Sequence, residues 1–175
     1  IGKLGVFLNE ENLSRNLKYL RQRLNGKKLR VATKSIRSLA ILKLLKDELR
    51  EDFCGLMAYS LEEAIWLVEN GFDDVLVGYP QFDQEYLDKL NESIHLKSAI
   101  TLMIDSPEHI EILNKYQDLR LCVDIDMSLK MPFLNFGVFR SSINKKKQIE
   151  ELRDRVSLSS HIVVGLMGYE AQIAG

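Results

Sequence analysis

Short apolar segments alternate with amphipathic segments along almost the entire chain, and this alternation limits the folds that the chain can adopt. The apolar segments are rich in branched residues and are bounded by turn residues, which is typical of buried strands. Strands are predicted at residues 29–33, 55–58, 74–78, 100–104, 119–126 and 161–168. Strands that alternate with helices form a parallel sheet that the helices cover.

The segments between the strands carry helix signals. Helices are predicted over residues 9–24, 36–50 and 145–156, and further helices start at Ser60, Asp83 and Ser106. Ser60 and Glu63 have the spacing of a capping box, and Pro107 stands at the first position of a helix, where proline is favoured. We also expect a short strand near residues 4–8 and a long loop after the fifth of the strands named above.

The fold class that follows is α/β, a (β/α)8 TIM-type barrel truncated to about six βα units. The chain has 175 residues, whereas a complete eight-stranded barrel needs about 250. We therefore expect residues 1–175 to form one barrel domain, the N-terminal part of a longer protein. The sequence begins at Ile1 without an initiator methionine, which agrees with this expectation.

Charge and composition argue against several partner classes. The chain carries 24 basic and 25 acidic residues, a net charge of −1, so neither nucleic acid nor an anionic membrane is an expected partner. The sequence has no apolar run of membrane-spanning length and no charged-then-apolar leader, which predicts a cytoplasmic protein. The two cysteines form no C-x-x-C pair and the three histidines are far apart in sequence, so no metal site is expected.

The fifth predicted strand alternates between apolar and more polar residues. One face carries Leu121, Val123 and Ile125, and the other carries Cys122, Asp124 and Asp126. An antiparallel edge strand would explain this alternation equally well, but in a buried parallel strand the carboxylates face the barrel axis. Because buried carboxylates are costly, Asp124 or Asp126 should meet a cation or a hydrogen-bond donor. Lys34 and Arg140 are the cations that we expect within reach.

Lys34 directly follows the strand predicted at residues 29–33. In a barrel of this type the C-terminal ends of the strands form the mouth, where reactive groups lie. Burial at the mouth would lower the pKa of a lysine and leave its amine able to attack a carbonyl carbon. The alternative is a lysine that only ends a strand.

Motifs at the strand ends occur in the order of a known family. RVATKSIR at 30–37, GLMAYSLEEA at 55–64 and DVLVGYP at 74–80 precede DID at 124–126, GVFRS at 137–141 and GLMGYEAQ at 165–172. Together they resemble the alanine racemase N-terminal barrel family of fold-type III pyridoxal-phosphate enzymes. Within this family they look most like the amino acid deaminase/aldolase branch, which is related to D-threonine aldolase and D-serine dehydratase.

The resemblance implies pyridoxal 5'-phosphate as the cofactor. Lys34 matches the lysine that holds the cofactor as a Schiff base. Arg140 matches an arginine that hydrogen-bonds the phenolic oxygen of the cofactor, with a surface arginine as the alternative. Tyr169 matches an aromatic residue that lies on the pyridine ring, and Gly165 and Gly168 would leave room for that ring. The alternative for Tyr169 is a tyrosine of the core.

The region after Lys34 departs from the racemase pattern. Ser38 stands where the racemases carry a tyrosine that holds the cofactor phosphate. Arg37, next to it, could bind a phosphate or a substrate carboxylate. Equally, Arg37 could be an exposed residue in the first turn of a helix.

By the same resemblance, the chain is expected to be part of an enzyme that acts on the Cα of a small amino acid, of the deaminase or aldolase type. The alternatives are an amino acid racemase, a homeostasis-type protein that binds pyridoxal phosphate without turnover, and a barrel without a cofactor. The last strands, their phosphate-binding loops and a β domain would follow Gly175, so the fragment would be inactive alone. A homodimer is expected for the full-length protein by analogy.

Overall fold

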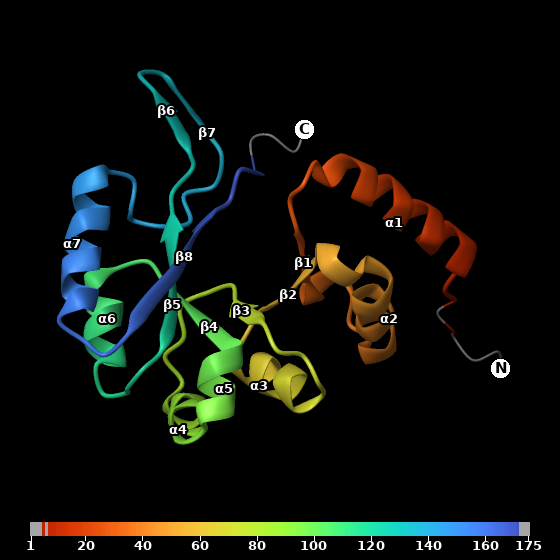
Figure 1. Ribbon diagram of the computed structural model, residues 1–175. Coiled ribbons are helices and arrows are strands. Elements are labelled where there is room, and N and C mark those ends of the chain that lie inside the picture. Colours follow the sequence, from red (N-terminus) through yellow and green to blue (C-terminus); the bar gives the residue numbers. More distant parts are fainter. Residues whose placement is uncertain (1–4, 6, 172–175) are drawn as a thin grey trace. The chain divides into compact units, whose positions relative to one another are not determined.

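The computed structural model describes residue 5 and residues 7–171 of the chain (Figure 1). Within these residues the main sheet has six strands, in the order β1 (Leu29–Ala32), β2 (Phe53–Ala58), β3 (Val75–Val77), β4 (Ile100–Ile104), β5 (Arg120–Ile125) and β8 (Ile162–Gly168). The pairs from β2 to β8 are parallel, which confirms the predicted parallel sheet. The chain divides into two compact units, Ile1–Gly55 and Leu56–Gly175.

The first unit contains two α-helices among its described residues. They are α1 (Glu10–Leu24) and α2 (Leu39–Leu49), and the 3-10 turns η1 (Thr33–Ser35) and η2 (Arg50–Asp52) flank α2. Asn9 begins α1, because its side-chain oxygen accepts a hydrogen bond from the N–H of Asn12 at 2.9 Å. The helix predicted over residues 9–24 is therefore confirmed. The strand predicted near residues 4–8 lies partly outside the described residues, and residues 5, 7 and 8 form no strand.

The helix predicted over residues 36–50 begins later than expected. The chain first makes η1. The backbone of Ile36 is then non-helical and that of Ser38 is extended, so α2 starts at Leu39. Its apolar face is the one that the leucine spacing predicted, with Leu42 and Leu45 buried. The early start was wrong because local apolar spacing does not reveal a 3-10 turn of three residues.

The second unit contains the remaining helices. They are α3 (Leu61–Glu69), α4 (Gln84–Glu92), α5 (Ile94–Ala99), α6 (Pro107–Leu113) and α7 (Lys146–Ser157). The predicted N-caps are confirmed: the side chains of Ser60, Asp83 and Ser106 each accept a backbone N–H from the first turn of their helix. The sequence did not predict α5, because six residues are too few to establish a helical period.

A β-hairpin stands where the sequence predicted a loop. Its strands β6 (Leu129–Met131) and β7 (Leu134–Phe136) pair antiparallel, and Figure 1 shows the hairpin projecting beyond the C-terminal end of β5. Strands of three residues are too short for a period of two to be recognised. The long loop was therefore a wrong prediction in this part of the chain.

The alternation predicted for the fifth strand is present in β5. Cys122 forms a buried apolar cluster with Leu76 and Met103, side chains of the two preceding strands. On the opposite face, Leu121 and Val123 are buried as well. Because Asp124 is two residues beyond Cys122, it lies on the same face as this cluster.

Neither Cys54 nor Cys122 forms a disulfide. Across the described part of the chain, no helix combines the length and the apolar character that crossing a membrane requires.

Candidate functional site

Polar and aromatic side chains of the second unit meet at the C-terminal ends of its strands. Tyr59 directly follows β2, Tyr79 comes two residues after β3, and Tyr169 directly follows β8. Asp124 lies near the end of β5, and Arg140 follows the hairpin. Since the carboxyl ends of parallel strands lie at one edge of a sheet, these five side chains come together there.

Arg140 is held on several sides by the second unit. Its Nε donates to the Asp124 carboxylate at 3.0 Å, and its Nη2 donates to the carbonyl oxygen of Gly78. Nη2 also lies 3.5 Å from the sulfur of Met103. Only 15% of the Arg140 side chain is exposed, so its charge-assisted bonds form where little water competes.

Two tyrosine rings face the guanidinium of Arg140. Its Cζ lies 4.4 Å from the ring centroid of Tyr79 and 5.8 Å from that of Tyr169. Tyr79 in turn lies 5.0 Å from Tyr59, with the two rings tilted by 58°. These distances are in the range of cation–π and tilted aromatic contacts, so Arg140 is fixed by aromatic as well as ionic contacts.

Asp124 is the carboxylate that orients Arg140. It is almost completely buried, and its Oδ1 has no hydrogen-bond partner among the described residues. Burial raises the pKa of Asp124 above its ordinary value, and the hydrogen bond and charge of Arg140 oppose this effect. The expectation that a carboxylate of the fifth strand meets a cation is confirmed, and the cation is Arg140.

Lys34 and Arg37 belong to the first unit. Lys34 follows β1 in the 3-10 turn η1, at the predicted strand end, but its side chain is exposed. The expected burial of Lys34 is therefore wrong in this structure, because Thr33 takes the buried position after Val31. Arg37 is also exposed and lies before α2, not in its first turn.

The structure brings the predicted residues Arg140 and Tyr169 together. The neighbouring Gly168, however, does not have the role that was expected of it. A Cβ atom on Gly168 would lie 2.6 Å from Cγ of Met127, whereas one on Gly165 would lie 3.9 Å from the sulfur of Cys122. Gly168 thus accommodates the Met127 side chain. The expectation that Gly168 leaves room for a flat ring is wrong, because Met127 occupies this space.

The sequence did not predict a role for two residues that lie at this site, Tyr59 and Tyr79. Tyr59 and Tyr79 were part of the matched motifs, but nothing in their local pattern distinguishes a ring that contacts Arg140 from any other tyrosine. Their signal was the position of an aromatic residue just after a predicted strand. A pocket that adjoins the cluster was not predicted either.

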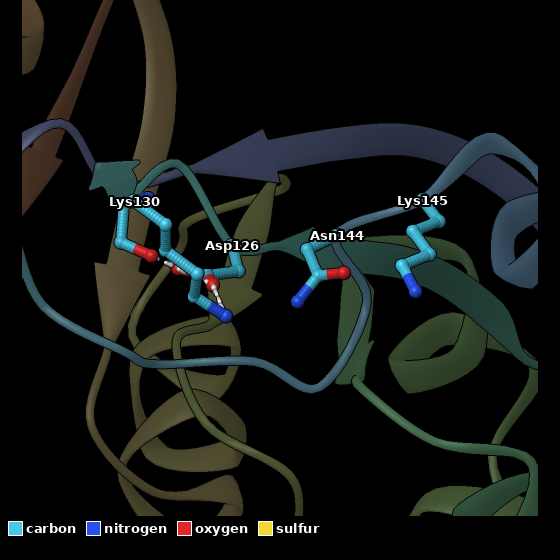
Figure 2. Close-up of a pocket in the computed structure, with 5 residues that line it drawn as sticks. Asp126, Lys130, Asn144 and Lys145 are labelled. Atoms are coloured by element: carbon cyan, nitrogen blue, oxygen red, sulfur yellow. Dashed lines mark hydrogen bonds and ion pairs between the residues drawn. The ribbon is translucent and has the colours of Figure 1, made fainter. Parts of the chain in front are cut away.

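This pocket has a volume of about 480 Å³ and is lined by Asp126, Ser128, Lys130, Asn144 and Lys145 (Figure 2). Asp126 and Ser128 follow β5, Lys130 lies in β6, and Asn144 and Lys145 lead into α7. Figure 2 shows Lys130 beside Asp126, with Asn144 and Lys145 on the adjoining segment.

The sequence matches the family model of the alanine racemase N-terminal domain over residues 8–174. The chain therefore belongs to the alanine racemase N-terminal domain family. Enzymes of this family depend on pyridoxal phosphate. No curated protein sequence matches the chain significantly.

Solved structures of related folds agree with this assignment. D-threonine aldolase from Filomicrobium marinum superposes with a TM-score of 0.67 at 19% identity, covering 90% of this chain and 40% of the aldolase. Alanine racemase from E. faecalis superposes with a TM-score of 0.70 at 17% identity, covering 94% of this chain and 43% of the racemase. D-threo-3-hydroxyaspartate dehydratase from Delftia sp. HT23 superposes with a TM-score of 0.70 at 15% identity, covering 92% of this chain and 41% of the dehydratase.

At these identities the likeness establishes the fold alone. It confirms the truncated TIM-type barrel as the fold class. The chain spans about two fifths of the length of these three proteins.

The residues around Arg140 fit two parts of pyridoxal phosphate, its phenolic oxygen and its flat ring. A guanidinium has five N–H donors, of which Arg140 uses Nε and Nη2. Within the described residues, no hydrogen bond engages its Nη1, which leaves two donors for an oxygen of a ligand. Tyr169 is 44% exposed, and its ring offers a flat surface beside this guanidinium.

Proposed function

We propose that this chain binds pyridoxal 5'-phosphate and is part of an enzyme that acts on the Cα of a small amino acid, of the deaminase or aldolase type. The observation that carries the proposal is the fixed Arg140. It is held by Asp124 and Gly78 and faced by two tyrosine rings, at the strand ends of a chain that belongs to a family of pyridoxal-phosphate enzymes.

Each predicted site residue has a role in this proposal. Lys34 binds the cofactor covalently through its amine. Arg140 donates a hydrogen bond to the phenolic oxygen, and its positive charge stabilises the ionised form of that oxygen. Tyr169 stacks on the ring, and Arg37 binds the phosphate or a substrate carboxylate. When bound, the cofactor withdraws electrons from Cα, and the protein selects which Cα bond breaks.

The contacts of Arg140 support its role. The carboxylate of Asp124 and the carbonyl of Gly78 leave this side chain little freedom, so its remaining donors point in one direction before a ligand binds. Preorganised donors of this kind lose little conformational entropy on binding. We propose further that the whole protein is a homodimer and is located in the cytoplasm.

An amino acid racemase is the second candidate. The alanine racemase from E. faecalis superposes with a TM-score of 0.70, and the D-threonine aldolase with one of 0.67. Backbone similarity does not separate the two reactions. The assay of the purified protein should therefore measure racemisation of amino acids together with deamination and aldol cleavage.

Borohydride reduction of the protein incubated with pyridoxal phosphate tests the proposal. We expect visible absorbance before reduction, and after it a covalent label that mass mapping of peptides places on Lys34. The variant Lys34→Ala should lose both signals. The matched control Lys28→Ala, an exposed lysine just before β1, should keep them. A label on another lysine would overturn the role of Lys34, and a protein without absorbance would overturn cofactor binding.

A further inference from the structure

The pocket lined by Asp126, Lys130, Asn144 and Lys145 adjoins Arg140 along the chain itself. Asp126 is two residues beyond Asp124, the partner of Arg140, and two residues along an extended strand advance it by about 7 Å on the same face. The backbone N–H of Asp126 donates to the carbonyl of Ile143 at 2.8 Å. The segment between Arg140 and Asn144 therefore runs beside the end of β5, and the pocket is lined by the residues that follow Asp124 and Arg140 along these two segments.

Among the described residues, one carboxylate lines the pocket, that of Asp126, and it already accepts hydrogen bonds. Oδ1 of Asp126 accepts the backbone N–H of Ser128 at 3.0 Å, and Oδ2 accepts the Ser128 hydroxyl at 2.8 Å. The side chain of Asp126 is 2% exposed, and the ammonium of Lys130 lies 3.9 Å from its Oδ2. This distance is the outer limit of an ion pair, so Asp126 orients Lys130 without occupying all of its donors.

The other lining side chains can donate hydrogen bonds. The side chain of Lys130 is 55% exposed, and its ammonium lies 5.1 Å from the ring centroid of Phe139, within the range of a cation–π contact. Within the described residues, no hydrogen bond or ion pair engages the side-chain amide of Asn144 or the ammonium of Lys145. Two ammonium groups and one carboxylate give the lining a net charge of +1, which favours an anion.

Two backbone donors just before α7 are already engaged. The N–H groups of Asn144 and Lys145 both bond to the side-chain oxygen of Gln148, at 3.1 and 3.0 Å. Phosphate sites at helix starts use such N–H groups. With these two N–H groups engaged, the side chains of Lys130, Asn144 and Lys145 are the donors that we assign to an anion such as a carboxylate.

We propose that this pocket binds the side-chain carboxylate of an acidic amino acid substrate, through Lys130, Asn144 and Lys145. The inference rests on the proposed function, since it makes the pocket the specificity site of the same reaction. The reacting Cα would lie near Arg140 and the distal carboxylate about one strand step further toward the mouth. The structure thus assigns acidic amino acids as the substrate class.

Calorimetric titration of the protein loaded with pyridoxal phosphate tests the inference. The probes are succinate and butyrate, which have the same carbon chain but two carboxylates and one, and neither has an amine that could react with the cofactor. We expect succinate to bind more tightly than butyrate. An exposed ion pair changes affinity by about fivefold. Lys130→Met and Lys145→Met should therefore each weaken the binding of succinate by about that factor and leave the affinity for butyrate unchanged.

The matched control is Lys115→Met, an exposed lysine that follows α6 in the same unit, and its affinity for succinate should equal that of the wild type. Equal succinate affinities in Lys145→Met and Lys115→Met would overturn the inference. So would a loss of affinity for pyridoxal phosphate, but not for pyridoxal, in the pocket variants, because the pocket would then hold the cofactor phosphate. Borohydride labelling of the same samples reports on the proposed function separately.

Discussion

Arg140 and Asp124 form an ion pair from which water is largely excluded. Their side chains are 15% and 2% exposed, and one oxygen of Asp124 lacks a hydrogen bond among the described residues. A buried carboxylate in this state loses hydration that one arginine bond does not fully replace. The pair therefore orients Arg140 at a cost in stability, which is a pattern expected at sites shaped for binding.

The pH dependence of stability tests this balance. Because burial raises the pKa of Asp124, the folded protein binds a proton there more readily than the unfolded chain between the ordinary and the raised pKa. The contribution of Asp124 to the free energy of unfolding is therefore present at low pH and is lost as the pH rises through that window. The free energy of unfolding of the wild type relative to Asp124→Asn should therefore fall with rising pH.

Urea denaturation of the two proteins at a series of pH values measures this difference. A difference that grows with pH would contradict the argument. It would mean that Arg140 outweighs burial and that the pKa of Asp124 is lowered.

The loop between β3 and α4 carries Tyr79 to Arg140, and the side chain of Gln81 holds it in place. The side-chain oxygen of Gln81 accepts a hydrogen bond from the N–H of Leu61, the first residue of α3, at 2.9 Å. Its amide nitrogen donates to the carbonyls of Tyr79 and Pro80 at 3.0 and 3.1 Å. The backbone carbonyl of Gln81 is 3.0 Å from Nε2 of the buried His109 in α6.

These bonds connect three separate elements through one residue. Burial lowers the pKa of His109, so its ring is neutral near pH 7. Since a carbonyl oxygen only accepts, Nε2 carries the proton that it donates to Gln81. The loop therefore has a defined conformation before any ligand reaches Tyr79.

Replacing Gln81 by Ala should destabilise this loop. The N–H of Leu61 would lose its partner, and an unsatisfied partly buried group costs about 1–3 kcal/mol. Urea denaturation should show a loss of that size for Gln81→Ala, together with weaker binding of pyridoxal phosphate as Tyr79 loses its fixed position. The control is Gln84→Ala, at an exposed position of α4, which should change stability by less than about 0.5 kcal/mol. Equal effects of the two variants would refute a holding role for Gln81.

Strand β8 lies at the edge of the main sheet. It pairs with β5 on one side, and no described strand pairs with its other side. Much of its apolar surface is exposed, at Ile162, Val163, Val164 and Leu166. An edge strand with unpaired backbone groups and apolar side chains is a template for pairing with another chain.

The 175-residue polypeptide by itself should therefore associate in a concentration-dependent manner. A charge on the exposed edge opposes such pairing, so Leu166→Lys should shift the weight-average mass in sedimentation experiments toward the monomer. Leu158→Lys is the matched control, because Leu158 is 90% exposed but precedes the strand. A monomer at every concentration, or equal effects of the two substitutions, would show that β8 does not mediate association.

Many features of the fold follow from short stretches of sequence. The limits of β4 coincide with the predicted residues 100–104, and Ser60, Asp83 and Ser106 cap the helices that they were predicted to begin. Apolar period and capping depend on residues within one turn or a few strand positions, so a local pattern contains the necessary information.

Tertiary structure decided which groups meet. The sequence predicted that Asp124 or Asp126 meets a cation or a hydrogen-bond donor, with Lys34 and Arg140 as the candidates. Only the folded chain shows that Asp124 meets Arg140, because the intervening hairpin sets where residue 140 returns to the sheet. The contact of Tyr79 with Arg140, the exposure of Lys34 and the packing of Met127 on Gly168 likewise depend on chain segments far apart or on local turns without a periodic signal. Contacts over such distances are set by loop paths and packing, which no local pattern encodes.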